Sequence, residues 1–334
     1  MTAAGPRPAP RSIVWVRLDR FGEVLLNLPA VGALRRAYPQ ARITLLVQPM
    51  LRELVAAAPG VDEVLSYAPA AGDPWWREAW RVTRLLRGRR FELAVVAHPK
   101  KSLHVAAALA GIPRRLGYNR KWGWLLTDRV PDRKASGELH EVEYNVRLVE
   151  ALGIAVGPVT FTLPIAAEAA GRTDRLLREE GLSPHERLIG VHPWASTPRK
   201  QWPVDQYQRC LERCMQEAGA APLILGGTEE GEASRRLCQR LGGRTVCLAG
   251  RLSLMELAAV LQRCRVLLTN DSGPMHLASA VGTPVVALFG GSQAATAPTR
   301  WGPWGNGHTV ISHPDLAAIT VDEVYQALLR YLPS

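Results

Sequence analysis

The sequence predicts an α/β protein of two domains, each a parallel β-sheet with helices on both faces. Short apolar runs typical of buried strands alternate with helical segments along the chain. Polar or glycine-bearing loops directly follow several of those runs. The chain has 334 residues, 47% apolar and 21% charged, which suffices for two folded cores and argues against disorder.

Seven apolar runs have the length and composition of buried strands. They span residues 12–18, 43–47, 92–97, 188–193, 221–227, 265–269 and 285–291. Helical patterns lie between them, at residues 24–38, 75–90, 229–241 and 277–281. Pro29 interrupts the first helical pattern, and the turn at residues 282–284 ends the last one. In sheets of this kind, ligands bind beyond the carboxyl ends of the strands.

The domain boundary is expected near residues 157–171, a stretch rich in Pro, Gly and Ala. We assign residues 13–165 to an N-terminal domain and residues 166–334 to a C-terminal domain, whose last helix is a candidate to pack back on the first domain. Residues 1–12 are rich in Pro, Ala and Arg without a hydrophobic segment, so we expect a disordered leader rather than a secretory signal. No apolar run is long enough to cross a bilayer.

The net charge of +11 is concentrated in the first half of the chain. Residues 1–165 contain 24 Lys and Arg against 14 Asp and Glu, whereas residues 166–334 contain 17 against 16. A basic half predicts an anionic partner, which is nucleic acid, anionic lipid or a phosphorylated acceptor. The five cysteines lack the spacing of a metal site and indicate reduced structural thiols in a cytoplasmic protein.

The strongest functional signal is the segment Asn270-Asp271-Ser272-Gly273-Pro274-Met275-His276. It joins an apolar strand pattern to a helical one. Such a loop directs free backbone N–H groups beyond the strand end, where the helix dipole favours an anion. Ser272 adds a hydroxyl, and His276 can donate a further hydrogen bond to phosphate. The segment predicts a phosphate site; an ordinary capped helix is the alternative.

Two carboxylates follow the first strand pattern. Glu23 comes directly after Gly22 at the start of a helix, and Asp19 lies in the same loop. A carboxylate at the end of a strand can act as a general base on an acceptor hydroxyl. The alternative is a capping carboxylate that interacts with the helix dipole.

Two further loops follow strands in the second half. Residues 192–203 contain the hydroxyl of Ser196 and the adjacent cations Arg199 and Lys200, which could neutralise a departing diphosphate or simply lie in solvent. Residues 226–230 end in Glu229 and Glu230, carboxylates suited to ribose hydroxyls. The G-x-G-x-x-G, G-x-x-x-x-G-K-[ST] and D-x-D patterns are absent, which weakens a dinucleotide enzyme, a P-loop NTPase and a metal–diphosphate clamp.

A basic segment at residues 75–90 combines arginines with tryptophans. Helical spacing puts Trp75, Ala79, Val82 and Leu86 on one face, and Arg77, Arg81 and Arg84 on another. Such a helix could rest on an anionic membrane, grip acceptor phosphates, or simply pack on its sheet.

Taken together, four segments resemble the ADP-heptose–lipopolysaccharide heptosyltransferase family, glycosyltransferase family 9. Residues 17–30 are similar to the family's opening pattern R-x-D-x-x-G-D-x-L-x-x-x-P-A. The other three are residues 192–203, 225–230 and 270–290, in the same order along the chain. The resemblance covers about residues 12–330.

The resemblance implies a GT-B fold, in which two Rossmann-like domains have parallel sheets facing across a cleft that holds the active site. It implies inverting, metal-independent transfer of heptose from ADP-heptose to a lipopolysaccharide inner-core acceptor, without a cofactor. The N-terminal domain would bind that anionic, lipid-linked acceptor, and the C-terminal domain the nucleotide sugar. We therefore expect a cytoplasmic protein that lies on the inner face of the inner membrane through its basic half.

The resemblance also implies roles for individual residues. Glu23 takes the place of the family's catalytic aspartate, with Asp19 in reserve, and Lys200 that of the donor-contacting lysine. The donor-binding set is Ser196, Lys200, Glu229 or Glu230 for ribose, Asp271 for sugar hydroxyls, and Ser272, Gly273 and His276 for phosphate.

The chain departs from the family pattern at three places. Glu23 replaces an aspartate, Trp194 stands where glycine is common, and residues 290–293 replace the commoner G-P-T. These departures leave the donor sugar, its nucleotide and the accepting core position open. The alternative functions are a nucleotide-sugar epimerase of the same architecture and a basic nucleic-acid-binding protein. We expect no nucleic-acid partner, because no recognised motif for one is present.

Overall fold

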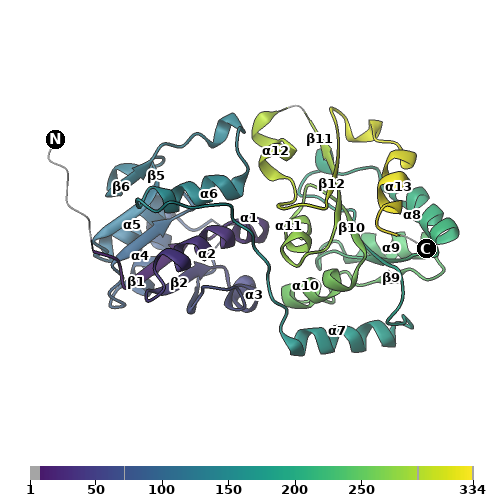
Figure 1. Cartoon of the computed structure of the whole chain (residues 1–334), viewed down its shortest axis with the longest axis horizontal. Coiled ribbons are helices and arrows are strands. Elements are labelled where there is room, and N and C mark those ends of the chain that lie inside the picture. The colour runs from purple at the N-terminus through teal and green to yellow at the C-terminus, as the bar shows by residue number, and fades with distance from the viewer. Residues whose placement is uncertain (1–7, 71, 292, 333–334) are drawn as a thin grey trace. The chain divides into compact units, whose positions relative to one another are not determined.

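In the computed structural model, residues 8–70, 72–291 and 293–332 are described. The chain divides into two compact units (Figure 1). Unit 1 comprises residues 1–133 and 141–161, and unit 2 comprises residues 134–140 and 162–334. The change of unit therefore falls four residues before the sequence-based boundary at 165/166. The short segment 134–140, which we assigned to the first domain, lies with the second.

Unit 1 is built on a six-stranded parallel sheet with the order β3-β2-β1-β4-β5-β6 among its described residues. Its strands are β1 Ser12–Val16, β2 Arg42–Val47, β3 Glu63–Ser66, β4 Leu93–Val96, β5 Arg114–Tyr118 and β6 Asp128–Val130. Its helices are α1 Phe21–Leu25, α2 Leu28–Ala37, α3 Arg52–Ala56, α4 Trp75–Leu86, α5 Lys101–Leu109 and α6 Glu141–Glu150, with 3₁₀ turns η1 Pro49–Leu51 and η2 Gly123–Leu125.

Unit 2 repeats this architecture, with the sheet order β12-β11-β10-β7-β8-β9 in its described part. Its strands are β7 Leu188–His192, β8 Ala221–Ile224, β9 Val246–Cys247, β10 Val266–Asn270, β11 Val285–Gly290 and β12 Thr309–His313. Its helices are α7 Ala167–Glu179, α8 Val204–Ala218, α9 Gly231–Leu241, α10 Leu254–Arg263, α11 Gly273–Ala280, α12 Pro298–Trp301 and α13 Val321–Leu329. Its 3₁₀ turns are η3 Lys134–Ser136, η4 Pro198–Lys200, η5 Ala294–Thr296 and η6 Leu316–Ala318.

Both sheets have the same doubly wound order. Numbered within its own unit, each runs 3-2-1-4-5-6, which confirms the predicted α/β class. The chain reverses its direction of winding between β1 and β4 in unit 1, and between β7 and β10 in unit 2. A crevice forms beyond the carboxyl ends of the strands at such a switch point, and ligands of doubly wound proteins bind there.

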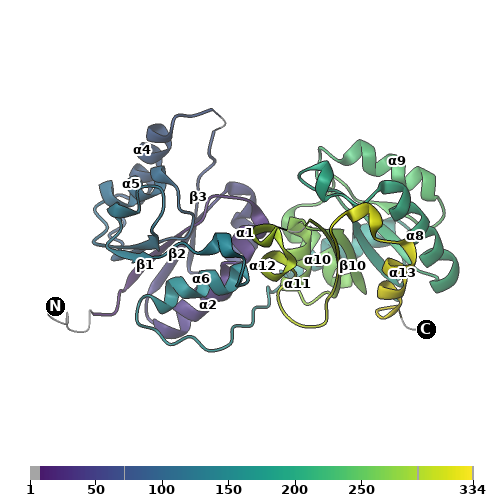
Figure 2. The same ribbon diagram turned by 90° about the horizontal axis from the view of Figure 1, so that it is seen from above.

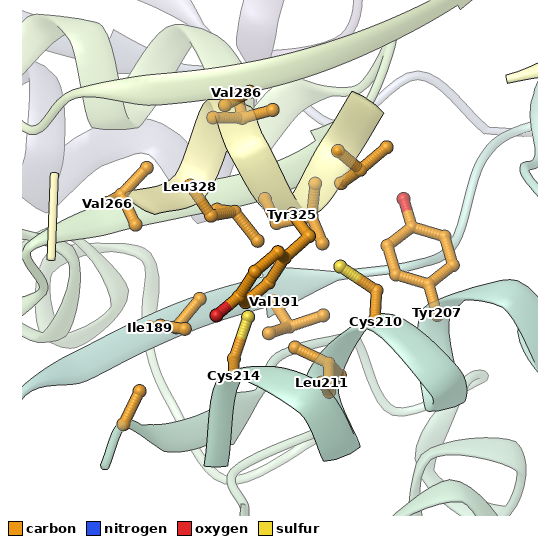
Figure 3. Packing of buried hydrophobic residues seen from close by; sticks show 14 of the residues in the cluster. Ile189, Val191, Tyr207, Cys210, Leu211, Cys214, Val266, Val286, Tyr325 and Leu328 are labelled. Atoms are coloured by element: carbon orange, nitrogen blue, oxygen red, sulfur yellow. The ribbon is translucent and has the colours of Figure 1, made fainter. Parts of the chain in front are cut away.

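Helices cover both faces of each sheet, as the sequence predicted. In unit 1, α4 and α5 lie on one face and α2 and α6 on the other (Figure 2). In unit 2, α8, α9 and α13 pack on one face of the sheet. Figure 3 shows the core beneath them, where the free thiols of Cys210 and Cys214 lie among apolar side chains of β7, β10 and β11.

Several local expectations need correction. The predicted leader 1–12 is partly ordered: Pro10 is buried, and the Arg11 N–H donates to Glu92 at 2.7 Å. Residues 1–7 of that leader lie outside the described residues. The last helix, α13, packs on α8 within unit 2. The helical pattern at 24–38 is interrupted as predicted, because α1 ends at Leu25 and α2 begins at Leu28 with Pro29 in its first turn. No helix in the described chain is long and apolar enough to span a bilayer.

Candidate functional site

Each unit places polar side chains at the switch point of its sheet. In unit 1 they follow β1 and β4, and in unit 2 they follow β7 and β10, with one more loop after β8. Both predicted groups of site residues lie at these strand ends, one group in each unit.

Arg17 organises the group in unit 1. It directly follows β1, and its side chain is 5% exposed. Its Nε donates to Asp19 at 2.7 Å, its Nη2 to Glu23 at 2.6 Å and its Nη1 to the carbonyl of Ala97 at 2.8 Å. One planar guanidinium therefore holds both carboxylates that the sequence singled out, and ties them to the end of β4.

Glu23 is not a helix cap. It lies in the first turn of α1, whose N-cap receives no side-chain hydrogen bond, and its carboxylate faces Arg17 instead. Burial raises the pKa of Glu23, and so do the hydrogen bond and charge of Asp19, while Arg17 opposes the rise. The buried Glu141 of α6 is a third carboxylate, 3.9 Å from Arg17. A carboxylate with a raised pKa beside a second one suits a general base.

Two residues after β4 complete this group. Burial, together with the charges of Arg17 and Lys100, lowers the pKa of His98 to about 4, so the ring is neutral at pH 7. Lys100 pairs with Glu78 of α4 at 2.6 Å, and Ser102 donates to the same carboxylate at 2.7 Å. Glu78 is therefore an inward-facing acid that joins α4 to the start of α5.

In unit 2 an ion pair links the two strands of the switch point. Lys200, at the end of η4, lies 2.5 Å from the carboxylate of Asp271, which follows β10. Lys200 is 35% exposed and Asp271 15% exposed, so the pair is accessible. An incoming diphosphate can take over the Lys200 ammonium and release Asp271 for other hydrogen bonds.

Asn270 fixes the loop that carries Lys200. Its buried amide accepts from the backbone N–H of Trp202 at 3.0 Å and donates to the carbonyl of Pro193 at 2.8 Å. The Trp202 indole in turn donates to the carbonyl of Ile319 at 3.0 Å. The two ends of the 193–202 loop are thus tied to β10 by one side chain.

The helix α11 begins earlier than predicted, at Gly273, so the predicted phosphate segment forms its first turn. Ser272 is the N-cap but does not cap the helix with its side chain; its hydroxyl lies 2.8 Å from that of Thr269. His276 lies inside the helix and is 6% exposed. The first-turn N–H groups of α11 and the Ser272 hydroxyl thus remain suited to an anion.

The loop after β8 distinguishes the two candidate ribose acids. Glu230 accepts from the backbone N–H of Gly227 at 2.7 Å, whereas Glu229 is exposed. Trp194 is 8% exposed and donates to Ser234 at 2.9 Å. A Cβ on Gly226 would lie 3.1 Å from its indole, so Trp194 packs directly against this loop.

The structure brings together most of the predicted site residues. Asp19 joins Glu23, and Lys200 joins Asp271 beside Ser272 and Gly273, whereas Ser196 is exposed on its loop. Sequence reasoning gave no role to the residues that hold these groups in place, although two of them, Arg17 and Asn270, lie in the motifs that it singled out. The other two are His98 and Glu141. Among the described residues, no cluster of His, Cys, Asp or Glu has the arrangement of a metal site.

Comparisons with known proteins agree with this architecture. The model of glycosyltransferase family 9 (heptosyltransferase) matches residues 79–327. Lipopolysaccharide heptosyltransferase 2 of Salmonella typhimurium is 27% identical over 288 residues, which cover 83% of this chain and 82% of that protein. The protein of the same name from Escherichia coli is equally similar.

Two solved structures resemble the chain along nearly its whole length. A glycosyl transferase family 9 protein from Veillonella parvula superposes with a TM-score of 0.87 at 22% identity, covering 96% of this chain and 97% of that one. The ADP-heptose lps heptosyltransferase II of Escherichia coli gives a TM-score of 0.82 at 25% identity, covering 96% and 98%. The two Rossmann-like units are those of the GT-B fold.

Proposed function

The chain belongs to glycosyltransferase family 9, and we propose that this glycosyltransferase transfers heptose from ADP-heptose to a lipopolysaccharide inner-core acceptor. The transfer inverts the anomeric centre and needs neither a metal ion nor a cofactor. The relatives in Salmonella typhimurium and Escherichia coli are named lipopolysaccharide heptosyltransferases, which supports the sugar and the acceptor class. A structural neighbour is named for ADP-heptose, which supports the donor.

The observation that carries the mechanism is the carboxylate pair held by Arg17. Glu23, with its raised pKa, takes the proton from the acceptor hydroxyl; Asp19 is the base in reserve. The acceptor oxygen attacks the anomeric carbon, and the bond from that carbon to the diphosphate oxygen breaks. ADP leaves with the electron pair, which gives inversion because the attack comes from the opposite face.

The residues of unit 2 stabilise the departing ADP. Lys200 exchanges Asp271 for the diphosphate, and the N–H groups at Ser272 and Gly273 donate hydrogen bonds to the diphosphate oxygens as their negative charge grows. Asp271, once released, hydrogen-bonds the donor sugar. The His276 side chain, in the same first turn, supports the phosphates, and Glu230 or Glu229 holds the ribose.

The enzyme acts at the cytoplasmic face of the inner membrane, where a lipid-linked acceptor presents its sugars. The net charge of +10 on residues 1–165 supports this, because the acceptor and the membrane surface are both anionic.

The test compares Glu23→Gln with Asp19→Asn. We expect Glu23→Gln to abolish transfer while ADP still raises the melting temperature of the protein. Unchanged turnover in Glu23→Gln would remove it as the base, and loss only in Asp19→Asn would assign that role to Asp19. Melting-temperature shifts with ADP, UDP, GDP and CMP identify the nucleotide. Turnover of the donor without an acceptor would instead favour an epimerase.

A further inference from the structure

Five tryptophans form an unusual exposed surface on unit 1. They are Trp75, Trp76 and Trp80 of α4, and Trp122 and Trp124 at η2, with 37%, 53%, 56%, 42% and 62% of each side chain exposed. They make up five of the eight large hydrophobic residues that are exposed in the described chain. Soluble proteins seldom gather exposed apolar side chains in one place unless the surface binds something.

The elements that carry these tryptophans pack together. α4 lies along α5, and α5 contacts η2 (Figure 2). Trp75 and Trp122 meet edge to face with ring centroids 5.4 Å apart, and Trp122 lies 6.0 Å from Trp124. Trp75, Trp122 and Trp124 therefore form one cluster, and Trp76 and Trp80 extend it along the same helix as Trp75. Sequence periodicity grouped Trp75 with Ala79, Val82 and Leu86 on one face. The structure buries those three with Glu78 and leaves Trp75 exposed.

Cations lie directly on these rings. The Lys101 ammonium is 3.8 Å from the ring centre of Trp75 and 4.8 Å from that of Trp122. The guanidinium of Arg77 lies 5.2 Å from the ring centre of Trp76, and that of Arg84 lies 4.7 Å from the ring centre of Trp80. We call the five tryptophans together with Arg77, Arg81, Arg84 and Lys101 the tryptophan surface.

The backbone holds the η2 part of this surface in a conformation that few residues adopt. Lys121 and Trp122 both have positive φ angles, 46° and 69°, which is uncommon for residues other than glycine. The buried ring of His104 donates from Nδ1 to the carbonyl of Lys121 at 3.0 Å and so anchors the turn. A Cβ on Gly123 would lie 2.7 Å from the side-chain oxygen of Asn119, so a larger residue there would displace that side chain. The fold thus maintains a strained turn that exposes two tryptophans.

From this arrangement we propose that the tryptophan surface docks unit 1 onto an anionic lipid bilayer. Indole rings favour the boundary between headgroups and acyl chains, and arginine and lysine interact with anionic headgroups above it. Charge complementarity favours a bilayer, since residues 75–90 hold six arginines and a single acid, Glu78, which is buried and paired with Lys100. The proposal rests on the proposed function in one respect, that the acceptor is lipid-linked.

The same element connects this surface to the carboxylate group of unit 1. Glu78, one turn from the exposed Trp75, binds Lys100 and Ser102 on the inner face of α4. The charges of Lys100 and Arg17 both lower the pKa of His98, and Arg17 holds the carboxylates of Asp19 and Glu23. A bilayer bound at α4 would therefore present lipid-linked sugars beside the residues that deprotonate the acceptor.

The experiment measures by sedimentation how the full chain partitions onto vesicles of phosphatidylcholine that contain about 30% phosphatidylglycerol. The test variant is Arg77→Gln/Arg81→Gln/Arg84→Gln. Each basic residue near an anionic surface contributes about five-fold, or ~1 kcal/mol. The triple variant removes three positive charges and leaves Asp73 without these ion pairs, so it should bind about 125-fold more weakly. Trp76→Ala/Trp80→Ala should lower binding by at least about ten-fold.

The matched control removes three arginines from α9 in unit 2, Arg235→Gln/Arg236→Gln/Arg240→Gln, all exposed. It loses the same net charge, and we expect less than about a three-fold effect because screening limits the reach of distant charges. An equal loss in this control would mean that net charge alone drives binding, and would overturn the proposal. So would wild-type protein that binds anionic and neutral vesicles alike.

Activity separates this proposal from the proposed function. The two α4 variants should turn over a de-acylated, water-soluble acceptor at the wild-type rate and lose turnover only with vesicle-embedded acceptor. Glu23→Gln should bind vesicles as the wild type does and lose turnover with both acceptors. If Glu23→Gln kept its turnover, the assignment of the base would be wrong and the proposed docking surface would be unaffected.

Discussion

Replacing Arg17 by methionine tests the core of the site most directly. Methionine keeps most of the aliphatic stem but removes the charge and all three hydrogen bonds, to Asp19, Glu23 and the carbonyl of Ala97. Because Arg17 is 4% exposed, water cannot readily replace it. Removing one partner of a buried ion pair costs about 3–5 kcal/mol, since the other charge is left uncompensated.

The assay is urea unfolding followed by tryptophan fluorescence, to which unit 1 contributes six of the ten tryptophans. With a slope of about 2 kcal/mol per molar urea, a loss of about 4 kcal/mol lowers the midpoint by about 2 M. The control is Arg42→Met, whose partner Glu63 lies 3.2 Å away while Arg42 is 66% exposed. An exposed pair contributes at most about 1 kcal/mol, so the control midpoint should move by no more than about 0.5 M. Equal shifts in the two variants would refute the reasoning.

The same variant has a signature in the pH profile. Arg17 lowers the pKa of Glu23 against the effects of burial and Asp19, so its removal raises that pKa further. A base with a higher pKa stays protonated to a higher pH, and the acid limb of kcat/KM should move to higher pH. An unchanged acid limb of kcat/KM would mean that another group is the general base.

Three further predictions concern stability. A carboxylate whose pKa is raised in the folded state destabilises the protein as pH rises through that pKa. Glu23→Gln should therefore have a higher melting temperature than the wild type above the raised pKa of Glu23, and an equal one below the ordinary pKa of a glutamate. Calorimetry at several pH values measures this difference. Asn270→Ala should cost about 1–3 kcal/mol for each of the two backbone groups that it serves, and weaken ADP binding in titration calorimetry. Gly290→Ala should lower the melting temperature, because the new Cβ would lie 2.7 Å from Leu316. In the control Gly171→Ala in α7, the new Cβ meets nothing within 4 Å, so stability should rise by about 0.5–1 kcal/mol.

The central strands could be predicted because their apolar runs are continuous. Parallel strands buried on both faces need such runs, and β1, β2, β4, β7, β8, β10 and β11 have them. The edge strands β3, β6, β9 and β12 were missed, and so was β5 next to an edge, because these strands are short or mixed in composition. β5 begins with two arginines, and β12 alternates between half-buried and exposed residues, so neither differs from a loop by pattern alone.

The site was predictable where its residues lie in loops after strands, and not where they act through distant contacts. Asp19, Glu23, Lys200 and Asp271 could be identified because polar residues at strand ends suggest ligand binding. Arg17 is adjacent to a predicted strand, but its partners include Ala97 and Glu141, which lie far along the chain. Only the fold shows where a long side chain ends, and so only the fold identifies Arg17 and Asn270 as the residues that hold the site.

The charge balance of the two groups is consistent with the role proposed for each. In unit 1, three carboxylates lie near the single guanidinium of Arg17. Burial, and then the neighbouring Asp19, raise the pKa of Glu23, although Arg17 opposes the rise. In unit 2, Lys200 and Asp271 are matched one to one beside the uncapped start of α11. A group with surplus carboxylate takes up a proton readily, whereas a balanced pair beside a helix N-terminus takes up an anion. The same sheet topology therefore supports a base in one unit and a diphosphate site in the other, because the residues that follow equivalent strands differ in net charge.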